Sequence, residues 1–127
     1  MFGEKLQDIQ ISLKNTTHDF DAKLSMFKDG SLNKDNFLEF AKKHKNEMSR
    51  LILLYDDLQI VNGFESAVQL FKLSAETQLE SDKQMIEWVK TGNDAAHIRS
   101  DALLQESFEY ELAGLAEYKS VQRSLKP

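Results

Sequence analysis

The three histidines of this chain, His18, His44 and His97, each have an acidic residue three positions away. Imidazole and carboxylate groups bind zinc, iron and manganese. A carboxylate one helical turn from a histidine can also orient the imidazole ring and raise its pKa, which suits general acid–base catalysis. The spacing therefore permits two kinds of chemistry, metal binding and proton transfer.

Metal binding depends on which side chains share one level of the folded protein. If long helices alternate in direction, His44 comes level with His18, with Asp82 and with the region of Glu109. Carboxylate-bridged di-metal bundles, however, use Glu-x-x-His on two helices, and that motif does not occur in this sequence. We therefore predict no bound metal and no other cofactor. Any metal would be held by His18, His44, Asp82 and Glu109.

His44 and Asp82 also allow a purely structural interpretation, in which the two side chains form a hydrogen-bonded pair inside the protein. A buried polar layer of this kind can fix helix register and oligomeric state at some cost in stability. If His44 only sets register, replacing it with leucine is expected to raise the thermal stability.

A second cluster, Asp94, His97 and Asp101, lies on successive turns close to Trp88. Proton transfer by this cluster is conceivable, but acidic residues near a helix N-terminus also complement the helix dipole, and Asp94 could serve only as a cap. The chain has no Gly-x-Ser-x-Gly motif and no glycine-rich phosphate loop, both of which mark common enzyme classes. We predict that the protein is not an enzyme.

Composition limits the remaining function classes. The 127 residues suffice for one domain, 41% of them are hydrophobic and 29% charged, and there is no cysteine. Disulfides and thiolate metal sites are therefore excluded. The net charge of −5 is spread along the chain, which argues against nucleic-acid binding. The basic run from Lys42 to Arg50 is interrupted by Glu47 and is typical of a solvated helix face.

The elements that position these side chains follow from the apolar periodicity, because apolar residues recur every three or four positions between breaks at Gly30, Gly63 and Gly92. This pattern predicts helices at about 2–28, 33–61, 63–91 and 94–125. Short breaks make consecutive helices antiparallel neighbours. We expect a single all-α domain over residues 1–127, an antiparallel up-down-up-down four-helix bundle. Two helical hairpins completed by dimerisation are the alternative.

The N-terminal residues alternate charged with apolar side chains, so the sequence predicts neither a signal peptide nor a membrane span. We expect a cytoplasmic protein without a membrane partner.

The expected function follows from apolar residues that exceed what one core-facing stripe requires. These residues form the predicted interaction surface, and they are Ile52, Leu53, Ile60, Val61, Leu70 and Leu73. We predict a non-enzymatic protein–protein interaction or scaffold bundle, whose partner is another protein or a second copy in a homodimer. The alternative is a bundle that binds a metal or a small ligand for a sensory, storage or redox role.

Overall fold

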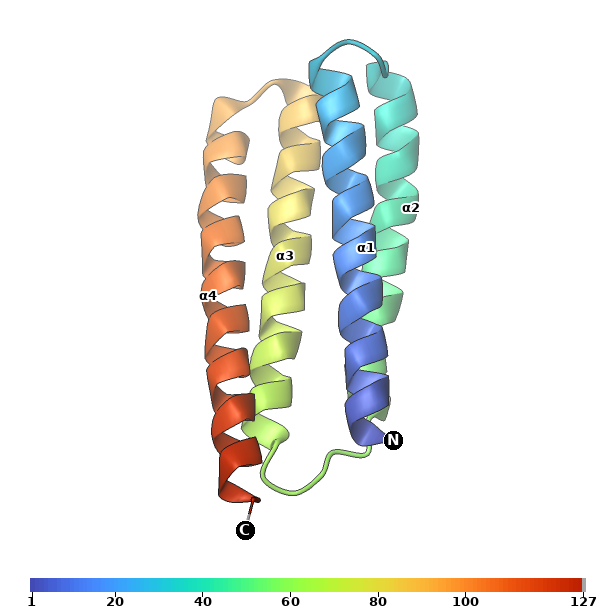
Figure 1. Cartoon of the computed structure of the whole chain (residues 1–127). Helices are drawn as coiled ribbons and strands as arrows, with labels where there is room; N and C mark the ends of the chain where they lie inside the picture. The colour runs from blue at the N-terminus through green and yellow to red at the C-terminus, as the bar shows by residue number, and fades with distance from the viewer. Residues whose placement is uncertain (127) are drawn as a thin grey trace.

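The computed structural model describes residues 1–126 and confirms the all-α fold. Its four α-helices and one 3₁₀ turn are α1 (Phe2–Lys28), α2 (Lys34–Leu53), η1 (Leu54–Asp57), α3 (Glu65–Thr91) and α4 (Asp94–Ser124). The helices lie lengthwise beside one another, with both ends of the chain at the same end of the molecule (Figure 1). Pro127, the last residue of the predicted domain, lies outside the described residues.

The helix boundaries at two of the three breaks have the capping chemistry that the sequence indicates. The side chains of Asn33 and Asn93 accept hydrogen bonds from the backbone N–H groups of Asn36 and Ala95, at 2.8 and 3.0 Å. Gly92 closes α3 with a positive φ of 73°, a conformation that costs glycine little. These local signals determine where α2 and α4 begin and where α3 ends.

The second helix is shorter than predicted, because the α-helix ends at Leu53 and not near residue 61. A 3₁₀ turn follows as far as Asp57, and Leu58 is extended. Asp56 and Asp57 place two negative charges at a helix C-terminus, where the dipole disfavours them. Ile60 then packs against the core from the connection, which crosses the lower end of the molecule in Figure 1.

Asn62 and Glu65 have the residue types and spacing of a capping box, but α3 does not begin in this way. Phe64 occupies the N-cap position without a side-chain hydrogen bond. Glu65 instead accepts a hydrogen bond from the backbone N–H of Gly63, at 2.8 Å. The carboxylate thus satisfies a free donor of the turn, while Asn62 does not act as the cap.

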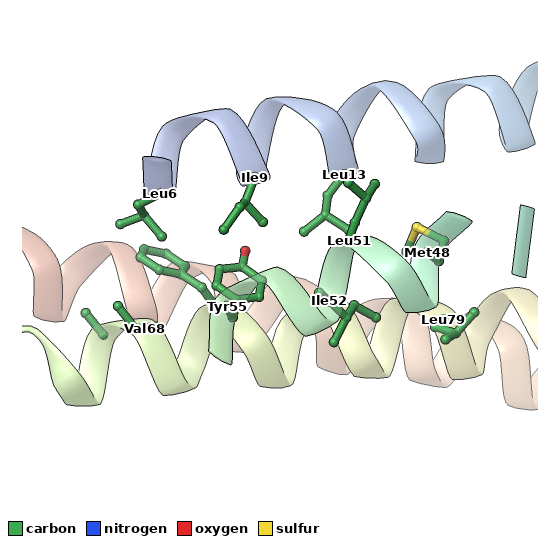
Figure 2. Packing of buried hydrophobic residues seen from close by; sticks show 12 residues of the cluster. Leu6, Ile9, Leu13, Met48, Leu51, Ile52, Tyr55, Val68 and Leu79 are labelled. Atoms are coloured by element: carbon green, nitrogen blue, oxygen red, sulfur yellow. The ribbon is translucent and has the colours of Figure 1, made fainter. Parts of the chain in front are cut away.

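The core consists of two apolar clusters along the helices. The cluster nearer the chain termini joins α1, α2, η1 and α3, and Figure 2 shows its side chains meeting between α1 and α3. Its buried members include Leu6, Ile9, Leu13, Met48, Leu51, Ile52, Tyr55, Val68 and Leu79. The other cluster contains Phe20, Leu24, Phe37, Ala41, Met85, Ile86 and Val89.

The interface between α3 and α4 is built differently, from small residues. The hydroxyl of Ser81 donates to the carbonyl of Ser100, and the hydroxyl of Ser100 donates to the carbonyl of Ser81, both at 2.8 Å. Ser74 and Ser107 make the same reciprocal pair, at 2.8 and 2.7 Å. The sequence separation grows from 19 in the first pair to 33 in the second, so α3 and α4 are antiparallel.

Gly114 continues this seam, and its lack of a side chain allows a close approach. A Cβ at this position would lie 2.8 Å from the ring of Phe71 and 3.4 Å from the carbonyl oxygen of Ala67. α4 packs along α3 through these small residues and has no comparable interface with α1 or α2 among the described residues. The fourth helix is therefore attached to the rest of the protein through α3.

Candidate functional site

The structure brings together two of the four candidate metal ligands. Nε2 of His44 on α2 donates to a carboxylate oxygen of Asp82 on α3, at 2.7 Å, and both side chains are buried. The second oxygen of Asp82 accepts a hydrogen bond from the side-chain amide of Gln78, at 2.9 Å. This arrangement is the hydrogen-bonded pair of the structural interpretation.

The pair forms a polar layer between the two apolar clusters, because Ala41 and Met48, which lie on either side of His44 along α2, belong to different clusters. The imidazole stacks on the ring of Phe20, with the centroids 4.4 Å apart. Its Nδ1 is buried and has no hydrogen-bond partner among the described residues. The carboxylate of Asp82 and the ring of Phe20 therefore hold the imidazole, and the pair joins α2 to α3 within the core.

The other two candidate ligands do not join this pair. His18 and Glu109 are both exposed, and Glu109 accepts a hydrogen bond from its helical neighbour Gln105 at 3.3 Å. Within residues 1–126 no group of three or more histidine or acidic side chains has a geometry that could hold a metal ion. The site geometry therefore gives the metal hypothesis no support.

Asp21 on α1 lies near this layer, and its pKa departs from the ordinary value. The residue as a whole is exposed, but neighbouring atoms partly desolvate its carboxyl group, and the negative charge of Asp82 acts in the same direction. Both effects raise the pKa of Asp21, against the smaller opposing influence of His18 and His44. Charge on Asp21 is thus unfavourable in the folded protein.

The second predicted cluster is a surface feature at the start of α4. His97 Nδ1 lies 3.3 Å from a carboxylate oxygen of Asp101, whose side chain is largely exposed. The edge of the Trp88 ring meets His97 at a centroid distance of 4.9 Å. Asn93, not Asp94, is the cap of the helix. Nothing in this exposed i, i+4 pair indicates a reaction centre beyond ordinary helix-surface pairing.

The predicted interaction surface is only partly available. Ile52 is buried in the core, and Ile60, Leu70 and Leu73 are half-buried. Leu53 and Val61 are exposed, at 62% and 48%. These positions therefore do not form a continuous exposed apolar strip on α2 and α3.

A different helix carries such a strip. Four large apolar side chains of α4, spaced at intervals of four and three residues, are between 38% and 52% exposed. We call them the α4 stripe, and they are Leu104, Phe108, Leu112 and Leu115. The buried positions of the same helix are small, namely Ala96, Ser100, Ser107 and Gly114. The helix thus turns its small residues inward and its large apolar residues towards solvent.

At Leu115 the stripe borders a groove between α1 and α4, whose floor is formed by α3 together with Met48 and Tyr55. The groove has a volume of about 550 Å³ and is lined by Leu115 and Glu111 from α4 and by Ile11 and Lys14 from α1. Ile11 is itself 49% exposed. Asp21 lies on the same α1 wall, so the groove combines an apolar side with polar and charged residues.

Counting apolar residues missed this site, but the sequence contains a signal for it. Ser74 and Ser81 are seven residues apart, as are Ser100, Ser107 and Gly114. Small residues at this interval occupy one line of a helix and allow two helices to pack closely. Such a line identifies the inward face of α4, and the large apolar residues of that helix then have to point elsewhere.

Comparison of the chain with protein-family models, curated proteins and solved structures finds no match. Among the helices of the described chain, none combines the length and the apolar character needed to span a bilayer. Proposals about function therefore depend on the geometry of this structure.

Proposed function

We propose that the protein is a non-enzymatic interaction module that binds another protein chain through the α4 stripe and the adjoining groove. The observation that carries the proposal is the inverted arrangement of α4, in which Leu104, Phe108, Leu112 and Leu115 are half-exposed while the inward positions are small. Contiguous exposed apolar residues of this kind mark interaction surfaces or ligand grooves in soluble chains. The proposal places this activity in the cytoplasm.

The form of the surface favours a helical partner. The stripe follows the axis of α4, and α1 forms a second wall beside it. An amphipathic helix laid into such a groove buries its own apolar face at positions spaced by three and four residues. Phe108, near the middle of the stripe, has the position and size expected of the residue that dominates the binding energy.

The first experiment is native mass spectrometry of protein purified without chelator, because one spectrum reports subunit count and any retained metal or small molecule. We expect an assembly of chains with no additional small mass, and we expect the double variant Phe108→Ser/Leu112→Ser to lose the partner chain. Leu53→Ser is the matched control, since Leu53 is 62% exposed but lies on α2. This control should retain the partner.

If the wild type is a monomer, the chain is immobilised and used to isolate a partner protein. The affinity of the purified partner for the wild type and the variants is then measured by calorimetry. The double variant should bind at least about 100-fold more weakly than the wild type, because both residues lie at the centre of the surface. Equal binding of the partner to all three proteins would show that the stripe is not the docking site.

The alternative function, small-ligand binding, has one observation in its favour. The groove volume of about 550 Å³ lies within the range of small-molecule sites. A stoichiometric small mass retained by the wild type and lost in Ile11→Asp, with no partner chain, would favour this alternative.

A further inference from the structure

We infer that the occupant of the α4 stripe is the α4 helix of a second copy of this chain, packed antiparallel about a two-fold axis. The inference rests on the proposed function, and it specifies the partner and the register. In this register Phe108 faces Leu112 of the second copy, and Leu104 lies beside Leu115 of the second copy. Symmetry repeats both contacts on the other side of the axis.

The inference is carried by the charges on the same face of α4. When a second α4 helix is laid antiparallel on the first, the acidic residue before the stripe in each copy meets the basic residue after the stripe in the other. Asp101 precedes the stripe and Lys119 follows it. The register that pairs Phe108 with Leu112 brings Asp101 opposite Lys119 of the second copy, at both ends of the contact.

The helix dipole accounts for only part of this charge order. It favours acidic residues in the first turn and basic residues in the last turn, and it falls off beyond them. Asp94 lies in the first turn of α4, so the dipole explains it. Asp101 and Lys119 lie well inside the helix, which spans Asp94–Ser124, so the dipole does not account for them. Asp101 lies 3.3 Å from His97 on its own helix, but its side chain is still 64% exposed and is free to face a partner of opposite charge order.

A parallel arrangement of two α4 helices is disfavoured by the same residues. In a parallel two-fold pair each residue faces its own copy, so that Asp101 meets Asp101 and Lys119 meets Lys119. Like charges placed opposite one another across an interface are repulsive and suppress that mode of association. Charge therefore selects the antiparallel orientation, while the apolar stripe supplies the contact area.

The groove provides room for the second helix. Leu115 lines this groove, and Leu104 and Phe108 line the adjoining hollow beside Gln78 of α3. A helix seated on these three side chains lies above the α3–α4 seam, next to the wall formed by α1. There it would also cover Ile11, the exposed apolar residue of that wall. The second copy thus buries apolar side chains on both sides of the groove.

Glu111 is the residue that opposes this pairing. It is exposed and lines the groove, and the two-fold axis brings the two Glu111 side chains of the dimer towards each other. Removing this charge should reduce the repulsion, so Glu111→Gln is expected to tighten the dimer about threefold.

The first test is sedimentation equilibrium of the wild type and of charge-reversal variants. Asp101→Lys and Lys119→Asp should each weaken the dimer about tenfold, because symmetry creates two repulsive pairs. The double variant Asp101→Lys/Lys119→Asp should recover most of the affinity. Glu117→Lys reverses an exposed charge outside this face of α4 and should not have the effect of Asp101→Lys. Two stripes that associate without a fixed register would not regain affinity in the double variant. If the double variant does not recover, the inference is therefore wrong.

The orientation is tested by cysteine cross-linking, for which the absence of native cysteine is an advantage. Asp101→Cys mixed with Lys119→Cys should form a mixed disulfide under mild oxidation. Asp101→Cys alone should not cross-link, because in the antiparallel dimer the two Cys residues would be about 27 Å apart at 1.5 Å per residue. Efficient cross-linking of Asp101→Cys alone would overturn the antiparallel register.

The two proposals fail separately. A wild-type chain that remains monomeric at about 1 mM, where even a weak contact would be occupied, rules out the second copy as occupant. If a different protein then binds the wild type but not Phe108→Ser/Leu112→Ser, the proposed function stands and only the inference is wrong. If that variant binds every partner as tightly as the wild type does, both are wrong. Circular dichroism of each variant verifies that the helices are intact.

Discussion

The two sides of α3 are packed in different ways. Towards α1 and α2 the helix presents large side chains such as Val68 and Leu79, which interlock in an apolar core interrupted by one polar pair. Towards α4 it presents Ser74 and Ser81, whose hydroxyls bond to the carbonyl groups of the facing helix. One helix thus combines a core of side-chain volume with a seam in which backbones approach closely.

The difference explains where the apolar surface of the molecule lies. A seam of serine, alanine and glycine, together with Tyr118 packed on Phe64, holds α4 against α3 without burying the residues of the α4 stripe. Phe108 and Leu112 therefore remain half-exposed, although the helix that carries them is firmly packed. Close packing through small residues on one side leaves an apolar surface free on the other.

Of the substitutions that distinguish the two sides of α3, the largest loss in the free energy of unfolding is expected at the His44–Asp82 pair. His44→Leu removes the hydrogen-bond partner of Asp82 and leaves a carboxylate buried, with Gln78 as its remaining contact. Breaking a buried pair in this way typically costs about 3–5 kcal/mol. Urea denaturation followed by circular dichroism should show a corresponding loss in the free energy of unfolding.

The matched control for this variant is His18→Leu, the same substitution at an exposed position of α1, which should change the free energy of unfolding by no more than about 0.5 kcal/mol. Replacing both members of the pair, as in His44→Leu/Asp82→Leu, should recover most of the loss, because no buried charge is left unpaired. If His44→Leu is as stable as the wild type, the pair does not fix the packing of α2 on α3.

On the seam side the expected loss is smaller and has a steric cause. Gly114→Val places a branched side chain where even a Cβ would lie 2.8 Å from the ring of Phe71. Phe71 is buried, so the ring cannot move freely, and overpacking of this kind costs about 2 kcal/mol. The variant should also lower the protection of α4 amides in hydrogen exchange, since α4 depends on this seam.

Gly3→Ala, at an exposed helical glycine, is expected to change the stability in the opposite direction. A Cβ at Gly3, also in a helix, meets only the Tyr118 hydroxyl at 3.8 Å, which is an ordinary contact. Alanine is the better helix former by up to about 1 kcal/mol, so this variant should be slightly more stable than the wild type. Equal stability of Gly114→Val and Gly3→Ala would mean that α3 and α4 do not pack closely at Gly114.

The sequence predicts the helices well where local chemistry determines them. Asn33, Asn93 and Gly92 mark helix ends through capping and a positive φ, and neither depends on the rest of the fold. The end of α2 was predicted too far along the chain, because Ile60 continues the apolar pattern although it packs from a loop. Periodicity records that a residue is buried but not which backbone conformation buries it.

The candidate site was predicted in part. The contact between His44 and Asp82 follows from matching positions along neighbouring helices, and the structure confirms it. The structure also shows that both side chains are almost fully buried. We therefore now expect His44→Leu to lower the stability and not to raise it, because the substitution leaves the buried Asp82 carboxylate without its partner. The exposed face of α4 was not predicted, because the large apolar residues were counted and the line of small residues at Ser100, Ser107 and Gly114 was not used.

The smallest predicted change in stability concerns Asp21. This residue of α1 lies near the His44–Asp82 layer, on the side of α3 that packs through large residues. Partial desolvation and the charge of Asp82 raise the pKa of Asp21 in the folded state. A raised pKa means that the folded protein binds this proton more tightly than the unfolded chain does. Stability from this group is therefore present below the ordinary pKa of 3.8 and is lost as the pH rises through the folded value.

Asp21→Asn should accordingly raise Tm at neutral pH by about 1–2 °C, since solvent screening limits the effect at an exposed residue, and the gain should vanish near pH 3. Asp29→Asn is the control with the opposite sign. The hydroxyl and backbone N–H of Ser31 donate to the Asp29 carboxylate and lower its pKa, so that variant should lose Tm at neutral pH. Thermal scans of both variants from pH 3 to 7 measure the two changes in Tm side by side. If the higher Tm of Asp21→Asn persists at pH 3, ionisation of Asp21 is not its cause.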